Sequence, residues 1–166
     1  MLHKHNTMNN LLIPTDFTPY SVRLAAQAVK MLNKKTNIVF FHAFEMPFYH
    51  HDMLTGTPPY AGLMNDNLRQ ACKQLKDQYP NLIGSIKFRF MRGNTNSLFR
   101  NFTDANNIDM IVCPQDYIYT KVHKDSINPV SFFKRSRIPV LQNMNRPEKT
   151  LKIKESALNL SMATAS

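Results

Sequence analysis

The feature that most constrains this chain is a regular alternation of short apolar runs with segments of helical periodicity. Apolar, strand-like runs stand at 10–16, 37–44, 85–91, 108–113 and 138–142. Between them, apolar residues recur every three to four positions at 18–34, 61–79, 95–106 and 128–136. This alternation predicts an α/β fold, a five-stranded parallel sheet with helices on both faces. Right-handed crossovers then favour a doubly wound, Rossmann-like topology.

Local signals refine several of these elements. Thr18 is expected to cap the first helix, with Pro19 at its first helical position. The run 85–91, SIKFRFM, alternates apolar residues with residues expected to face solvent, and is therefore predicted to lie near a sheet edge. The stretches 45–60 and 114–127 carry prolines or polar residues and are predicted to be loops.

The length of 166 residues suits one domain, and 43% apolar residues are enough for a core. We assign 1–8 to an N-terminal extension, 9–143 to the domain and 144–166 to a polar C-terminal tail. No apolar run approaches the length that spans a bilayer, so no membrane association is expected. The first ten residues lack the apolar stretch of a secretory signal, which favours a cytoplasmic location.

Five segments in order, LLIPTDFTPYS, IVFFHAF, MRGNTNSLF, IDMIVCP and RIPVLQ, resemble the universal stress protein (UspA-like) family over about 9–143. The resemblance implies a five-stranded parallel sheet of adenine-nucleotide-hydrolase-like topology and a homodimer. It also implies a family divided into members that bind ATP and members that do not.

The resemblance also indicates where a nucleotide would lie. In the ATP-binding members, the aspartate after the first strand and the backbone at the end of the second strand contact adenosine. The matching positions are Asp16 and Ala43. With the flanking residues and the end of the fourth strand, the candidate cofactor-binding set is Pro14, Thr15, Asp16, Ala43, Cys113 and Pro114.

The phosphate loop of the ATP-binding members is absent from the expected place. Their pattern is a glycine, two residues, a glycine, nine residues, and a glycine followed by Ser or Thr. Those glycines let backbone N–H groups approach phosphate oxygens. Here Pro114 and Tyr117 replace the first two, the third falls near Ser126 or Ile127, and no glycine occurs between 94 and 166. We therefore expect no cofactor, with ATP or AMP binding through an atypical loop as the alternative.

No catalytic or metal-binding constellation is recognisable. Asp16 is expected to be a hydrogen-bond acceptor at the start of a helix. The sequence has no second carboxylate or serine–histidine pair near it at a spacing familiar from acid–base or nucleophilic catalysis. His42 is expected to be an interior histidine with a backbone partner. His50 and His51 adjoin Asp52 but lack further converging ligands. The chain is thus expected to be neither an enzyme nor a metalloprotein.

The net charge of +10 favours anionic partners and is concentrated in one part of the chain. Between 121 and 154 there are nine basic residues, opposed only by Asp125 and Glu148. A solvated basic surface is the preferred interpretation, because Phe132 and Phe133 have the helical spacing of core residues rather than of a stacking platform. Arg135 and Arg137 stand near a strand start, where an anionic ligand or a partner could meet them.

Taken together, the sequence predicts a non-enzymatic, dimeric stress-response or signalling module. The homodimer is expected to form through the short strand at 138–142, because an edge strand can pair across a two-fold axis. Two alternatives stay open, an adenine-nucleotide sensor with an atypical phosphate loop and a basic nucleic-acid-associated protein.

Overall fold

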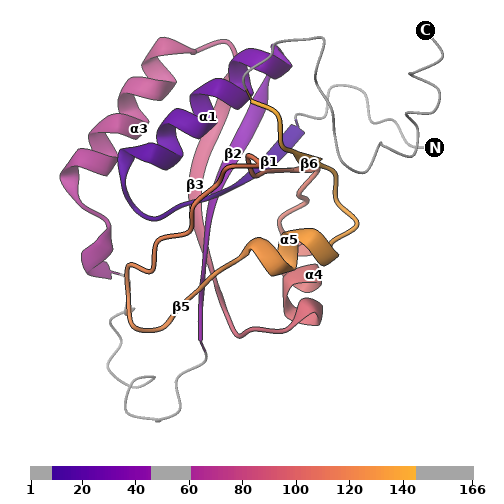
Figure 1. Cartoon of the computed structure of the whole chain (residues 1–166). Helices are drawn as coiled ribbons and strands as arrows, with labels where there is room; N and C mark the ends of the chain where they lie inside the picture. The colour runs from indigo at the N-terminus through magenta and orange to yellow at the C-terminus, as the bar shows by residue number, and fades with distance from the viewer. Residues whose placement is uncertain (1–8, 46–60, 145–166) are drawn as a thin grey trace, which may run out of the picture.

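In the computed structural model, which describes residues 9–45 and 61–144, one sheet lies between two layers of helices (Figure 1). Its order is β3-β2-β1-β4-β6, and neighbouring strands on this path are parallel. The bounds are β1 Asn9–Pro14, β2 Thr36–Phe44, β3 Ile83–Arg92, β4 Met110–Val112 and β6 Val140–Leu141. The predicted α/β fold class is confirmed.

Helices among the described residues cover both faces of the sheet (Figure 1). On one face lie α1 (Pro19–Leu32) and α3 (Asp66–Gln78), and on the other α4 (Asn96–Ala105) and α5 (Val130–Arg135). The predicted cap of α1 is confirmed, because Thr18 Oγ1 accepts a hydrogen bond from the Tyr20 amide at 3.3 Å and Pro19 is the first helical residue. The helix expected from position 61 begins only at α3, after the short 3-10 helix η1 (Ala61–Leu63).

Both faces of the sheet are buried, which explains the continuous apolar run of β2. Ile38 and Phe40 belong to the core under α1 and α3. Val39 and Phe41 belong to the core under α4 and α5. Phe132 and Phe133 lie in that second core with exposed fractions of 3% and 2%, so their predicted core position is confirmed.

The two edges of the sheet are β3 and β6. The predicted edge position of the alternating run is therefore confirmed. The last strand is shorter than expected, Val140–Leu141 instead of 138–142. Met144, which we placed in the tail, is buried at 8% exposure. The rest of that tail and the extension 1–8 lie outside the described residues.

A sixth strand, β5 (Ser126–Ile127), lies in a stretch predicted to be a loop. It pairs antiparallel with β2. The physical reason is a difference in strand length. β1 ends opposite Phe41, so the last residues of β2 have no neighbour on that side until β5 takes the place. The segment 114–128, which contains β5, is called the closing segment below.

Candidate functional site

The site begins where the chain leaves β1. The Thr15 amide continues the ladder by donating to the Phe41 carbonyl oxygen at 2.9 Å. Its hydroxyl oxygen lies 2.8 Å from Ser21 Oγ and accepts from the Phe17 amide at 2.9 Å. With only 2% of its surface exposed, Thr15 orders the turn from β1 into α1 and offers little to a ligand.

Asp16 belongs to the same turn. Its Oδ1 accepts hydrogen bonds from the Thr18 amide at 3.0 Å and from the Thr18 hydroxyl at 2.6 Å. The geometry agrees with the prediction of a carboxylate acceptor that orders the helix start.

Phe17 has φ +65°, the left-handed region that a bulky side chain rarely adopts. The hydrogen bond from its amide to Thr15 Oγ1 helps to hold this conformation. Its ring points toward the ends of the neighbouring strands, with centroids 4.9 Å from His42 and 6.0 Å from Phe90. The strained backbone therefore places an aromatic ring, 3% exposed, in the core at the carboxyl ends of the strands, where doubly wound folds have their ligand crevice.

His42 joins the turn to the closing segment. Its Nδ1 lies 2.7 Å from the Thr15 carbonyl oxygen and its Nε2 lies 2.8 Å from Ser126 Oγ. A carbonyl oxygen can only accept, so Nδ1 carries the proton, and in the neutral ring Nε2 accepts from the serine hydroxyl. Burial lowers the pKa of His42, which favours this neutral form. The predicted interior histidine with a backbone partner is confirmed.

The closing segment also covers the end of β2. Ala43, 1% exposed, lies opposite Ile127. Two residues further along the chain, the amide of Glu45 donates to the Asp125 carbonyl oxygen at 2.7 Å. Antiparallel ladders alternate with a period of two, so Ala43 and Ile127 form the same kind of hydrogen-bonded pair. The backbone that the family resemblance assigns to adenosine is paired here with the protein itself.

Cys113 and Pro114 follow β4, which neighbours β1 in the sheet. They line a cavity of about 330 Å³ with residues of α5 and β6, and neither Asp16 nor Ala43 borders it. Burial raises the pKa of Cys113 to about 11, although nearby Lys134 acts in the opposite direction. Of the six predicted site residues, only Cys113 and Pro114 line this cavity.

Tyr117 stands at the position of the second expected glycine. Its amide donates to the Pro114 carbonyl oxygen at 3.1 Å, which makes a turn at the start of the closing segment. Its ring stacks on Tyr20 with centroids 6.3 Å apart. Burial raises the pKa of Tyr117, so the phenol stays protonated. The side chain packs between the closing segment and α1, in place of an open glycine-rich turn.

Sequence reasoning missed the pairing of His42 with Ser126. The atoms are those of a base and its nucleophile, as in serine hydrolases. However, Ser126 is 7% exposed, and neither residue borders the described cavities of about 450, 330 and 340 Å³. The pair fastens the closing segment, and no spacing signal could reveal it because the two residues are 84 positions apart.

Two further features bear on function. Within 9–45 and 61–144, no three His, Cys, Asp or Glu side chains gather as a metal site, and no helix is long and apolar enough to cross a membrane. His50, His51 and Asp52 lie outside the described residues.

No protein-family model matches the sequence, and no curated protein matches it. Several solved structures do match this chain. A universal stress protein in complex with cAMP is 18% identical, covering 81% of this chain and 95% of that one at a TM-score of 0.47. A protein of the universal stress protein family from Burkholderia pseudomallei is 11% identical, covering 82% of this chain and 96% of that one at a TM-score of 0.49. UspA from Lactobacillus plantarum is 13% identical (83% and 99%, TM-score 0.39).

All three are universal stress proteins. They belong to the family that the five sequence segments resemble. At identities this low, the likeness concerns the fold and does not extend to a ligand.

Proposed function

We propose that this chain is a universal-stress-type protein, a non-enzymatic, dimeric stress-response or signalling module that does not bind ATP in the usual way. The observation that carries the proposal is the antiparallel pairing of β5 with Ala43 and Phe44 at the end of β2. The stress-response assignment itself rests on the family resemblance of the five sequence segments.

Three features disfavour nucleotide in the crevice. The Ala43 backbone is already paired with Ile127. The Asp16 carboxylate is engaged by Thr18. Pro114 has no N–H to offer a phosphate. A nucleotide would have to displace the closing segment and break its hydrogen bonds before making its own.

Calorimetric titration with ATP and with AMP tests this part of the proposal. We expect no saturable heat that depends on Asp16, up to about 1 mM of either nucleotide. Micromolar affinity that Asp16→Asn weakens would contradict the proposal and support the alternative of a nucleotide sensor with an atypical loop. In that case Asp16→Asn should abolish the heat if the nucleotide occupies this crevice.

A homodimer is proposed through β6. The Ile111 and Cys113 amides donate to the carbonyl oxygens of Pro139 and Leu141, at 2.9 and 3.0 Å. Because alternate residues of a strand point to opposite sides, the backbone of Val140 faces away from β4. We propose that it pairs with the same strand of a second copy across a two-fold axis.

Light scattering coupled to size exclusion tests the dimer. At micromolar concentration we expect particles of about twice the 19.2 kDa of one chain. Val140→Pro removes the outward amide and should give monomers, whereas Val140→Ala loses more side-chain packing but keeps that amide and should stay dimeric. Particles of 19.2 kDa from the unmodified protein would refute the proposal.

We also propose a cytoplasmic location, which fractionation of cells producing the full chain would check. The nucleic-acid alternative gains nothing from the two adjacent aromatic residues of α5. Phe132 and Phe133 are both in the core and offer no ring to a base.

A further inference from the structure

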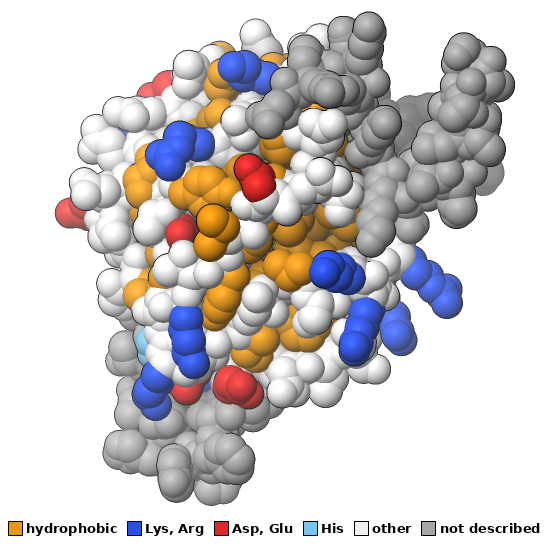
Figure 2. Space-filling view, in the orientation of Figure 1, with side chains coloured by type: hydrophobic (Ala, Val, Ile, Leu, Met, Phe, Trp, Pro, Cys, Tyr) orange, Lys and Arg blue, Asp and Glu red, His pale blue; other side chains and the backbone are white. Residues whose placement is uncertain are grey.

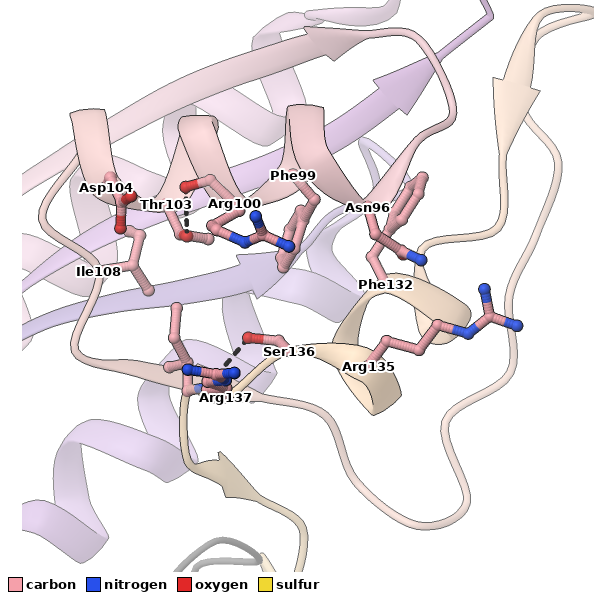
Figure 3. A pocket seen from close by; sticks show the side chains of 11 residues that line it. Asn96, Phe99, Arg100, Thr103, Asp104, Ile108, Phe132, Arg135, Ser136 and Arg137 are labelled. Carbon is pink, nitrogen blue, oxygen red and sulfur yellow. Dashed lines mark hydrogen bonds between the residues drawn. The ribbon is translucent and has the colours of Figure 1, made fainter.

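A second cavity lies between α4, α5 and the segment that leads into β6 (Figure 3). Its volume is about 450 Å³. The lining contains three arginines and one acidic residue, Arg100, Arg135, Arg137 and Asp104. Ile108 and Ile138, which also border it, precede β4 and β6, so the cavity lies toward the amino ends of those strands. It is thus distinct from the crevice at the carboxyl ends, where ligands of doubly wound folds bind.

Lys and Arg side chains gather over α4 and α5 (Figure 2), and the positive charge of this cavity is not neutralised by the described part of the protein. None of its three arginines has a carboxylate of the described residues within 4.0 Å, whereas Arg69 and Lys73 on α3 each have one. Figure 3 shows Arg100 on α4 facing Arg137 across the opening, with Arg135 extending outward from the end of α5. An anion entering between Arg100 and Arg137 would meet guanidinium groups from two sides.

The frame that carries these arginines is ordered by two part-buried hydrogen bonds and a buried ring contact. Thr103 Oγ1 donates to the Arg100 carbonyl oxygen at 3.0 Å, and Ser136 Oγ accepts from the Ile138 amide at 3.0 Å. Beneath them the rings of Phe99 and Phe132 stack with centroids 5.4 Å apart and an interplanar angle of 12°. The backbone positions of the arginines are therefore fixed before any ligand arrives, which lowers the entropic cost of binding.

We propose that this cavity binds a small phosphorylated molecule. Guanidinium groups match phosphate oxygens with two parallel hydrogen bonds, and such charge-assisted bonds are stronger than neutral ones. The volume falls within the range of roughly 300–1,000 Å³ typical of small-molecule sites. A hollow of this size fits a compact ligand better than a nucleic-acid strand, which needs a continuous groove with exposed aromatic rings.

Inorganic pyrophosphate is the probe for the test, titrated calorimetrically into the full chain at about 150 mM NaCl, where diffuse surface attraction is screened. The double variant Arg100→Gln, Arg137→Gln should weaken binding about ten-fold or more, because each arginine supplies charge-assisted hydrogen bonds. The control Lys87→Gln, Arg89→Gln removes the same charge from exposed positions of β3 and should change the affinity less than about two-fold.

A substitution at Asp104 should change the affinity for pyrophosphate in the opposite direction to the arginine variants. Asp104→Asn removes the one carboxylate that borders the cavity and should tighten pyrophosphate binding. All variants alter exposed side chains, so unchanged melting temperatures will show that they fold normally.

Several results would overturn the proposal. One is the absence of saturable pyrophosphate binding up to about 5 mM. Another is equal weakening by the cavity pair and the β3 pair, which would indicate unspecific attraction to net charge. A third is tighter binding of a mixed-sequence single-stranded DNA than of pyrophosphate, lost in the cavity variant, which would make the surface a nucleic-acid contact.

Discussion

The His42 imidazole and the Ser126 hydroxyl lie 2.8 Å apart, both buried, although 84 positions separate them in the chain. Through Nδ1 the same ring binds the Thr15 carbonyl oxygen at 2.7 Å. One side chain of β2 thus connects the end of β1 with β5. The contact holds the closing segment over the crevice, and its strength can be measured.

Removing the serine hydroxyl should loosen the closing segment. Ser126→Ala leaves Nε2 of a buried histidine without its partner, which costs about 1–3 kcal/mol of unfolding free energy. Trypsin should also cut faster after Lys121 and Lys124, which are exposed in this segment. Urea denaturation and mass-resolved limited proteolysis give the two readouts.

Ser131→Ala is the matched control, since Ser131 lies exposed on α5. It should change stability by less than about 0.5 kcal/mol and leave the cleavage pattern unaltered. Equal effects of the two substitutions would show that the hydroxyl of Ser126 contributes nothing specific.

Stability should fall as the solution becomes mildly acidic. Burial, with a smaller contribution from His123, lowers the pKa of His42, while the bond to Thr15 and the charge of Asp16 partly oppose it. Below about pH 6.5 the unfolded chain therefore binds a proton that the folded chain resists. The stabilising contribution is present above that pH and is lost as the pH falls toward the folded pKa.

Urea unfolding of the full chain at pH 7.5 and pH 5.0 measures this dependence. His42→Gln should be less stable at both values but should show a smaller difference between them. An unmodified protein whose stability does not change between the two pH values would exclude a neutral buried imidazole.

The turn after β3 requires a glycine at position 93. Gly93 has φ +120°, and a Cβ built there would lie 2.4 Å from Leu98 Cδ1. Leu98 is partly exposed and can move, so the backbone conformation is the larger obstacle. Gly93→Ala should cost about 1–3 kcal/mol of unfolding free energy.

Gly62→Ala offers the comparison, because no atom of the described residues, apart from its chain neighbours, lies within 4 Å of a Cβ at that position. Thermal denaturation should place this variant close to the unmodified protein. Similar losses from both substitutions would mean that glycine content, not the conformation at position 93, determines the effect.

Both cysteines should be slow to react in the folded protein. Burial raises the pKa of Cys72 and of Cys113 to about 11. At pH 7.5 only roughly one thiol in three thousand is then the reactive thiolate. Labelling with a disulfide reagent should be slow in buffer and complete within minutes in urea. In Cys113→Ser the remaining signal should come from Cys72, which is the more exposed of the two. Rapid labelling of the folded chain that is lost in Cys113→Ser would contradict the burial of Cys113.

Much of the fold could be predicted because its elements have strong local patterns. The unbroken apolar run of β2 follows from burial on both faces, and the alternation in β3 follows from its place at an edge. β5 could not be predicted, since Ser126–Ile127 has no strand pattern of its own. Its pairing depends on β1 ending before β2 does, which is a property of the assembled sheet.

The candidate site was predictable only in part. The turn residues Thr15 and Asp16 follow the first strand as expected, yet their polar groups are used within the turn. Two of the three arginines of the cavity could be predicted to meet an anionic ligand, because Arg135 and Arg137 lie close together in the sequence. Arg100 joins them from another helix, and only the packing of α4 beside α5 brings it there.

The closing segment also has a consequence for how the protein responds to its surroundings. A binding protein gains stability in proportion to the logarithm of its free ligand, and so its lifetime follows the metabolic state of the cell. Here β5, which lies beside the end of β2, is part of the same polypeptide, at an effective concentration that dilution cannot change. We therefore expect the pairing of β5 with β2 to be indifferent to the adenylate pool.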